Sequence, residues 1–321
     1  MSLSAGEVKA KASELGADLV GIAAGAVLDA HPPDPARPQA PRAISEEDSK
    51  SVIVLAKHHL AGTSRLKAWD DRHKQYSAEL VLSELEEISL KLVYFLEDRG
   101  FPALTIPPMH ADPAEYRANG DTRGPLSLIH AAVEAGLGTL GLNLMLLTPQ
   151  YGPRVLLAGV MTSAELEPDP RMTTPLCLGE SCGRCLMACP GDAILHWGLD
   201  KGKCAPHASP YGYEYLMKHL EQIIGTEDRQ EQVRLLTRTK ESFMSWQSLL
   251  RGVGVYSGCT RCVDVCPVGE DYERHLKVIQ EEIPESTEAK AARLRAMQQA
   301  RERGERIEGL ERSRRWIGEE A

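Results

Sequence analysis

The chain has 321 residues, of which 42% are hydrophobic and 26% are charged, and its formal net charge is -9. This composition is that of a globular protein, and the negative charge argues against sequence-independent binding to nucleic acid or anionic lipid. No stretch approaches the roughly 18 apolar residues of a membrane span, and the N-terminus carries neither a secretory nor a twin-arginine signal. We therefore expect a cytoplasmic protein, in which the eight cysteines indicate metal or redox chemistry rather than disulfides.

The first part of the chain alternates between predicted helices and strands, which indicates an α/β (α+β) domain over residues 1–170. Its apolar strands suit a sheet that is covered on two faces. In chain order, the expected elements are a helix at 6–15, strands at 19–23 and 51–56, a helix at 77–99, a strand at 103–106, a helix at 126–135 and a strand at 155–161. Residues 107–125 form a long loop rich in Pro, Asp, Gly and Arg, and loops of this length are often functional.

The character of the sequence changes after residue 170. Residues 171–275 form a second predicted domain, which holds all eight cysteines and a helical insert at 213–250. The remaining residues, 276–321, read as a charged, solvated C-terminal helix with Trp316 and Ile317 as an apolar docking point near its end.

The cysteines form two runs with one cysteine between them. The runs are Cys177-x4-Cys182-x2-Cys185-x3-Cys189-Pro190 and Cys259-x2-Cys262-x3-Cys266-Pro267, and the cysteine between them is Cys204. This spacing is close to that of bacterial ferredoxins with two [4Fe-4S] clusters, in which the fourth cysteine of each run binds the other cluster. The crossing assigns Cys177, Cys182, Cys185 and Cys266 to one cluster, which we call cluster A. Cluster B takes Cys189, Cys259, Cys262 and, by elimination, Cys204.

Zinc is the alternative for these cysteines, because Cys-x2-Cys pairs also occur in zinc ribbons. The Cys-x3-Cys-Pro endings are absent from zinc ribbons and favour the ferredoxin-like interpretation. We therefore predict a ferredoxin-like module with two [4Fe-4S] clusters that moves electrons one at a time.

A glycine-rich turn, Gly136-Leu137-Gly138-Thr139-Leu140-Gly141-Leu142-Asn143, follows the predicted helix at 126–135. It matches Gly-x-Gly-x-x-Gly, but it follows a helix instead of a strand and lacks a downstream acidic partner, so we reject dinucleotide binding. Two interpretations are open. The glycines let the backbone approach a bound cofactor, or they form a helix C-cap and a tight turn into an apolar segment.

Three further motifs, with the glycine-rich turn and the cysteine runs, resemble epoxyqueuosine reductase and the related reductive dehalogenases over roughly residues 10–275. These motifs are Asp121-Thr122-Arg123-Gly124-Pro125, Leu146-Leu147-Thr148-Pro149-Gln150-Tyr151-Gly152 and Leu166-Glu167-Pro168-Asp169. The resemblance implies a nitroreductase-like domain that binds base-off cobalamin, followed by the ferredoxin-like module. The clusters would reduce the corrin, which would reduce a substrate while an acid supplies a proton.

The resemblance also implies which residues bind the corrin. Contacts with the corrin or its nucleotide tail are expected from Gly136, Gly138, Gly141, Asn143, Tyr151 and Arg154. For the last three, the alternatives are turn chemistry and a surface cation.

Three residues are candidates for the proton donor. The family's aspartate falls on Thr122, and Asp121 lies one residue earlier. His130 could replace the acid or bind cobalt, and Tyr116 could supply the phenol that reductive dehalogenases use. The alternative readings are a packed helix histidine and a surface tyrosine.

The chain also departs from the family. The lysine of the family's Gly-Lys-Asn is Leu142 here, two extra residues follow Cys177, and no helical-repeat extension for tRNA follows. With the negative charge, these features argue against a tRNA substrate and favour a small molecule, with a ferredoxin or flavodoxin as the electron donor. We predict a cobalamin-dependent iron-sulfur reductase. The alternatives are an electron-transfer protein without corrin and a protein that reduces cobalamin for another enzyme.

Overall fold

The computed structural model describes residues 3–66, 71–108, 112, 123–251 and 259–319. Its N-terminal half is built on a four-stranded sheet with the strand order β1-β2-β6-β3, in which every neighbouring pair is antiparallel. The strands are β1 (Leu19–Ala24), β2 (Ser51–His58), β3 (Ala103–Ile106) and β6 (Val155–Thr162). All four predicted strands are confirmed, and β2 continues two residues beyond its predicted end.

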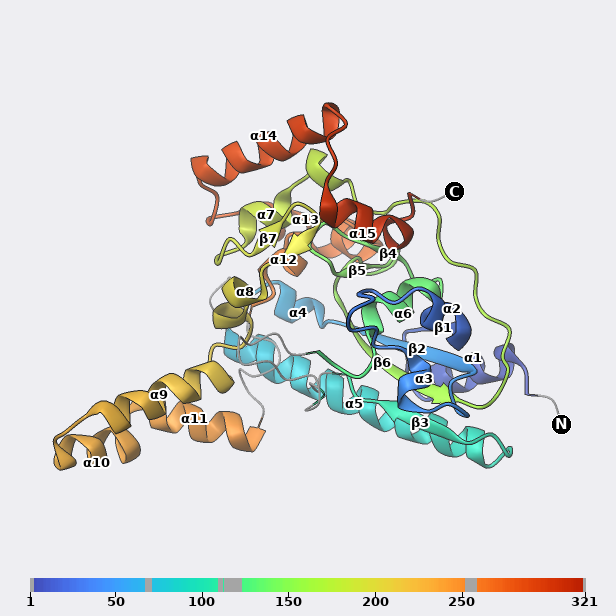
Figure 1. Ribbon diagram of the computed structural model, residues 1–321, viewed down its shortest axis with the longest axis horizontal. Coiled ribbons are helices and arrows are strands. Elements are labelled where there is room, and N and C mark those ends of the chain that lie inside the picture. Colours follow the sequence, from blue (N-terminus) through green and yellow to red (C-terminus); the bar gives the residue numbers. More distant parts are fainter. Residues whose placement is uncertain (1–2, 67–70, 109–111, 113–122, 252–258, 320–321) are drawn as a thin grey trace.

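One face of the sheet packs against α1 (Ala5–Glu14) and the long helix α5 (Asp71–Glu97), as Figure 1 shows. The register places Ile53 opposite Ile22 and Val160, and all three side chains are fully buried in this core. The helix α5 ends just before Gly100, which has the left-handed φ of +84° that favours glycine after a helix. The predicted stop of this helix is therefore confirmed.

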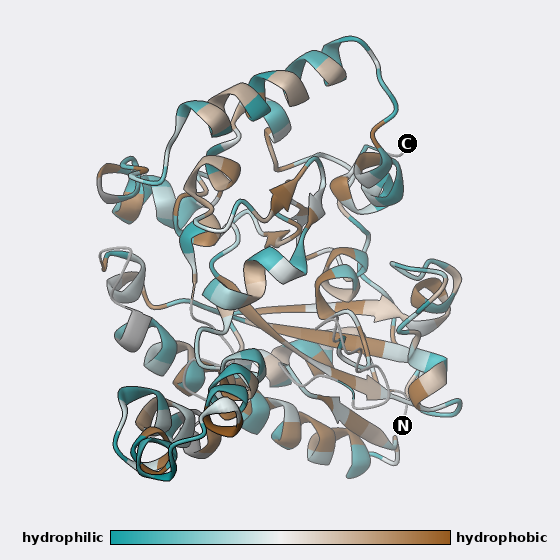
Figure 2. Cartoon of the chain, turned by 60° about the vertical axis from the view of Figure 1, so that its left-hand side comes forward, coloured by the Kyte–Doolittle hydropathy of each residue, from teal (hydrophilic) through white to brown (hydrophobic). Residues whose placement is uncertain are grey.

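The opposite face packs against α6 (Leu128–Glu134), so the sheet is covered on both faces as predicted. Val52 and Val54 point to this second core, since successive side chains of a strand alternate between faces. The helix lies very close to β1, because a Cβ at Gly21 would come within 2.3 Å of the Ala135 carbonyl oxygen. Figure 2 shows the result, with the strands mostly in the hydrophobic colour and the helices banded.

Smaller elements join these layers. They are α2 (Gly25–Ala30), α3 (Pro41–Ile44), α4 (Ala61–Ser64) and the two short strands β4 (Thr139–Leu140) and β5 (Leu146–Leu147). The strands β4 and β5 pair antiparallel, so the second half of the glycine-rich turn is a small hairpin.

The cysteine-bearing part of the chain consists of short elements. These are the 3-10 helix η2 (Gly179–Ser181), α7 (Arg184–Ala188), β7 (Ile194–Leu195), β8 (Gly198–Leu199), α8 (Lys201–Ala208), α12 (Arg261–Asp264), the π-helical turn η3 (Tyr272–Leu276) and α13 (Lys277–Gln280). The predicted helical insert is confirmed as three helices, α9 (Tyr213–Gly225), α10 (Arg229–Thr237) and α11 (Lys240–Arg251), which project away from the sheet (Figure 1). Within the described ranges, no helix is both long and apolar enough to cross a bilayer.

The C-terminal segment differs from the single solvated helix that the sequence predicted. It forms α14 (Glu288–Glu302) and α15 (Glu308–Ile317), separated at Gly304, which has a φ of +66°. Both helices are partly buried, because Met297 of α14 and Leu310 of α15 contribute to hydrophobic clusters. Trp316 and Ile317 are buried at the end of α15, which confirms the predicted docking point.

Candidate metal centre

The four cysteines assigned to cluster A line one cavity. Its empty volume is about 370 Å³, part of it open to solvent, and Cys177, Cys182, Cys185 and Cys266 all face it. The rest of the lining is largely apolar and includes Leu142 of the glycine-rich turn and Gly183 at the start of α7. The fold thus brings Cys266, from the second run, beside three cysteines of the first.

The four cysteines assigned to cluster B also lie close together. The pKa of Cys262 is raised well above its ordinary value, first by burial and then by the neighbouring charges of Cys259, Cys204 and Cys189. Burial and the charge of Cys189 likewise raise the pKa of Cys204. Cys204 and Cys262 both pack against the buried cluster that contains Cys189, as does Cys185 of the other group.

Among the residues that the structure describes, no three His, Cys, Asp or Glu side chains converge as they would around a single bound metal ion. The choice of [4Fe-4S] clusters over zinc therefore stays a prediction from the spacing of the cysteines.

Backbone N–H groups point at two of the cysteine sulfurs. The Sγ of Cys177 accepts from the amides of Leu142, at 3.4 Å, and Gly179, at 3.3 Å. The Sγ of Cys189 accepts from the amide of Ala193 at 3.3 Å. Hydrogen bonds of this kind stabilise negative charge on sulfur and raise the potential of a cluster bound there.

Arg154 secures the backbone of the second cysteine run. Its guanidinium forms a bidentate pair with Asp271, both N···O distances being 2.7 Å, and its side chain is 1% exposed. It also donates to the carbonyl oxygens of Cys266 at 2.8 Å and Val268 at 2.7 Å. Arg154 is therefore not the surface cation of the alternative prediction, and its donors are used within the protein.

Three more buried or partly buried cations bind the cysteine loops. Arg184 donates to the carbonyl of Val265 at 3.0 Å, and Lys290 of α14 donates to the carbonyl of Cys189 at 2.9 Å. Lys74 of α5 contacts the carboxylate of Asp264 at 2.5 Å. No local pattern predicts the roles of Lys74 and Lys290, because both lie far from the cysteines along the chain.

The glycine-rich turn contacts the protein's own atoms closely. A Cβ at Gly138 would lie 1.9 Å from the carbonyl oxygen of Leu147, and one at Gly141 would lie 2.8 Å from the Oδ1 of Asn143. Gly136 has a φ of +72° and follows α6 at its C-terminus. The packing of the chain therefore accounts for these glycines, as the helix-cap interpretation expects.

Two other residues assigned to the corrin also have partners within the protein. Asn143 donates its Nδ2 to the carbonyl of Cys262 at 3.2 Å. Tyr151, which is half-buried, stacks on His58 with a centroid distance of 5.0 Å. Asn143 thereby links the turn to the second cysteine run.

Of the three candidates for the proton donor, the structure describes only His130. The Nδ1 of His130 lies 2.7 Å from the Ser127 hydroxyl, and its ring meets Trp316 edge-on at 4.4 Å. Burial lowers its pKa to about 4, so the ring is neutral near pH 7 and serves the packing of α15. Asp121 and Tyr116 lie outside the described residues.

Known proteins with related sequences are reductases. Epoxyqueuosine reductase of Listeria monocytogenes is 29% identical over 162 residues, which cover 50% of this chain and 35% of the relative. Tetrachloroethene reductive dehalogenase of Desulfitobacterium hafniense is 35% identical over 134 residues, which cover 40% of this chain and 22% of the relative. The chain thus matches about a third or less of these relatives' length. No protein-family model matches.

Two solved structures share the fold. A reductive dehalogenase, described with a mechanism for B12-dependent dehalogenation, superposes with a TM-score of 0.53 at 18% identity and covers 97% of this chain and 38% of its own. An epoxyqueuosine reductase superposes with a TM-score of 0.50 at 20% identity and covers 98% of this chain and 78% of its own. The chain is thus similar in sequence and in its mixed α/β fold to epoxyqueuosine reductases and to reductive dehalogenases.

Proposed function

We propose that this protein is an oxidoreductase that passes electrons one at a time through two [4Fe-4S] clusters held by its eight cysteines. The observation that carries the proposal is the convergence of Cys266 with three cysteines of the first run around one cavity. The relatives point the same way, since they are named reductases.

Several residues of the chain would stabilise the negative charge of such clusters. When bound, a cluster accepts and donates single electrons at a potential set by its thiolates, hydrogen bonds and surroundings. The amides of Leu142 and Gly179 stabilise the sulfur of Cys177. Arg154 and Lys290 hold the carbonyls beside the ligands, and their buried positive charges offset the thiolates.

We propose cobalamin, in its base-off form, as the acceptor of these electrons. The support is the resemblance and the B12-dependent dehalogenase that shares the fold. Arg154, Asn143 and the glycines that were assigned to the corrin have contacts within the protein, so their role in corrin binding stays a prediction. We therefore derive no step through the corrin, and the same observation favours the alternative of a two-cluster electron-transfer protein.

The remaining parts of the proposal concern partners. We propose a small-molecule substrate, because the net charge of -9 does not favour tRNA. A ferredoxin or flavodoxin as electron donor and a cytoplasmic location complete the proposal. Asp121 and Tyr116 are the proposed proton donors that lie outside the described residues.

The test is anaerobic cluster reconstitution followed by titration with cob(II)alamin and electron paramagnetic resonance. We expect about eight irons and eight labile sulfides per chain, and a base-off cobalt spectrum at one corrin per chain. The variant Cys185→Ser should retain about half of the iron. If both clusters form but the cobalt spectrum is unchanged from that of free cobalamin, the alternative of an electron-transfer protein without corrin is supported. Zinc in place of iron would overturn the proposal.

A further inference from the structure

Two consecutive residues at the tip of the β4–β5 hairpin reach one ligand of each proposed cluster. The backbone amide of Leu142 donates to the Sγ of Cys177 at 3.4 Å, on the side of cluster A. The side chain of Asn143 donates to the carbonyl oxygen of Cys262 at 3.2 Å, on the side of cluster B. Leu142 and Asn143 both line the cavity of cluster A. The tip of the hairpin therefore lies between the two groups of cysteines.

The side-chain amide of Asn143 is held in one orientation. The residue is only 5% exposed, and its Oδ1 accepts from the backbone amide of Met145 at 3.3 Å. Gly141 leaves room for this side chain, because a Cβ at that position would come within 2.8 Å of the same oxygen. Since the oxygen faces an N–H group, the nitrogen with its two N–H donors faces Cys262.

The same amide also forms a hydrogen bond with the sulfur of Cys262. Burial raises the pKa of the Cys262 thiol most strongly, and the hydrogen bond from Asn143 acts against that rise. The amide therefore favours negative charge on this sulfur. Leu142, Gly179 and Ala193 also donate to cysteine sulfurs, but they do so through the backbone. A substitution can remove the donors of Asn143, whereas it leaves backbone donors in place.

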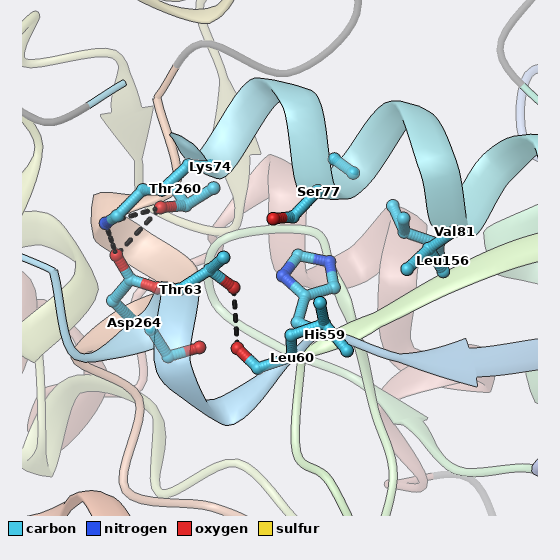
Figure 3. Close-up of a pocket in the computed structure, with 11 residues that line it drawn as sticks. His59, Leu60, Thr63, Lys74, Ser77, Val81, Leu156, Thr260 and Asp264 are labelled. Atoms are coloured by element: carbon cyan, nitrogen blue, oxygen red, sulfur yellow. Dashed lines mark hydrogen bonds and ion pairs between the residues drawn. The ribbon is translucent and has the colours of Figure 1, made fainter. Parts of the chain in front are cut away.

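The helix α12, which carries Cys262, has a second buried polar contact. The Nζ of Lys74 lies 2.5 Å from the Oδ2 of Asp264 and 3.0 Å from the Oγ1 of Thr260 (Figure 3). The side chains of Lys74 and Asp264 are only 3% and 2% exposed. The ring of His59 faces a cavity beside this pair, which at about 20 Å³ has room for about one water molecule. Because the charges of the pair cancel, this contact adds little net charge beside Cys262.

We propose that Asn143 is a positioning residue that raises the reduction potential of cluster B by donating from its side-chain amide to Cys262. The inference rests on the proposed function, since it needs an iron-sulfur cluster at the second group of cysteines. Reduction adds one negative charge to a cluster, so a donor directed at a ligand sulfur stabilises the reduced form more than the oxidised form. In a buried site this interaction is stronger than it would be in water.

The test is a redox titration of the cluster-reconstituted full chain under anaerobic conditions, followed by electron paramagnetic resonance. The wild type should give one midpoint potential for each cluster, and Cys204→Ser, which should lack cluster B, identifies the potential of cluster A. Asn143→Leu has nearly the same side-chain shape but no donor. In this variant the potential of cluster B should fall, while that of cluster A stays unchanged. At the wild-type midpoint potential of cluster B, less than half of that cluster should then be reduced.

Two further variants serve as controls. Asn143→Gln keeps both N–H donors on a longer side chain and should recover part of the potential. Gln232→Leu is the matched control, because the amide of Gln232 also donates to a backbone carbonyl, that of Thr226, but does so in the helical insert. It should leave both potentials unchanged.

Three results would overturn the role of Asn143. The first is an unchanged potential of cluster B in Asn143→Leu, and the second is an equal fall of both potentials. The third is loss of the iron of cluster B from both Asn143 variants, because a residue that sets only the potential is not required for assembly.

The wild type separates this inference from the proposed function. If the wild type forms both clusters and Asn143→Leu keeps the wild-type potentials, the role of Asn143 alone is refuted. If the wild type forms no cluster, or binds zinc in place of iron, the proposed function is refuted, and this inference with it.

Discussion

Replacing Arg154 by methionine tests whether this residue holds the second cysteine run in place. The change keeps much of the side-chain volume and removes the five N–H donors that contact Asp271 and the carbonyl oxygens of Cys266 and Val268. Asp271 then loses its bidentate partner. We therefore expect both lower stability and a selective loss of cluster A, whose ligand Cys266 is released.

The magnitude follows from burial. Removing one member of a buried ion pair costs roughly 3–5 kcal/mol. The Asp271 side chain retains 23% of its exposure, so water compensates part of the loss and the lower value applies. We expect the free energy of unfolding to fall by about 3 kcal/mol. At about 2–4 °C per kcal/mol, this corresponds to a fall in Tm of about 6–12 °C.

The assay combines thermal unfolding by circular dichroism with iron analysis after reconstitution. Arg154→Lys keeps the charge but not the planar fork, so it should fall between wild type and Arg154→Met. Arg274→Met is the matched control, because Arg274 pairs with Glu270 at 2.9 Å and both side chains are 64% exposed. Such a pair contributes about 0–1 kcal/mol. The reasoning would be refuted by a Tm of Arg154→Met that lies within about 2 °C of the Tm of Arg274→Met, together with full retention of iron.

Three further predictions concern the clusters and the C-terminal helix. Cys266→Ser should remove cluster A and Cys204→Ser cluster B, each leaving about four of eight irons, as measured by iron content and electron paramagnetic resonance. Glu134→Ala removes the buried carboxylate that accepts from Arg315 and Trp316 and should destabilise the docking of α15 by about 3 kcal/mol, detected as a red shift of tryptophan emission. His130 has a folded pKa of about 4, below the unfolded value of 6.5, so the unfolded chain binds the proton first. Stability should fall as the pH falls from 6.5 toward 4, by at most about 3 kcal/mol, and His130→Leu should reduce this slope.

Each of these predictions has an outcome that contradicts it. Loss of all iron in both cysteine variants, with circular dichroism unchanged, would mean that the two groups are not independent. Wild-type emission in Glu134→Ala would show that α15 docks without the buried carboxylate. An unchanged pH slope in His130→Leu would mean that the imidazole is not neutral in the folded protein.

Much of the fold could be predicted from the local sequence. The apolar runs at 19–23 and 51–56 are strands, and the long helix ends before Gly100, because strand periodicity and helix termination depend on neighbouring residues. The antiparallel order of the sheet could not be read in this way, since it depends on which strands meet. The pairing of β2 with β6 joins segments that the sequence separates by the whole of α5 and α6.

The site divides along the same line. Sequence alone determined which thiols are candidates for cluster ligands, because a cluster requires soft donors whose spacing is short within each run. Only the tertiary structure decided what surrounds them: Arg154 meets Asp271 across 117 positions, Lys290 meets Cys189 across 101, and Lys74 meets Asp264 across 190. It also decided that other atoms of the chain occupy the space beside the glycines of the turn and that His59 faces a cavity. Contacts of this kind arise when separate elements pack together, and no local pattern encodes them.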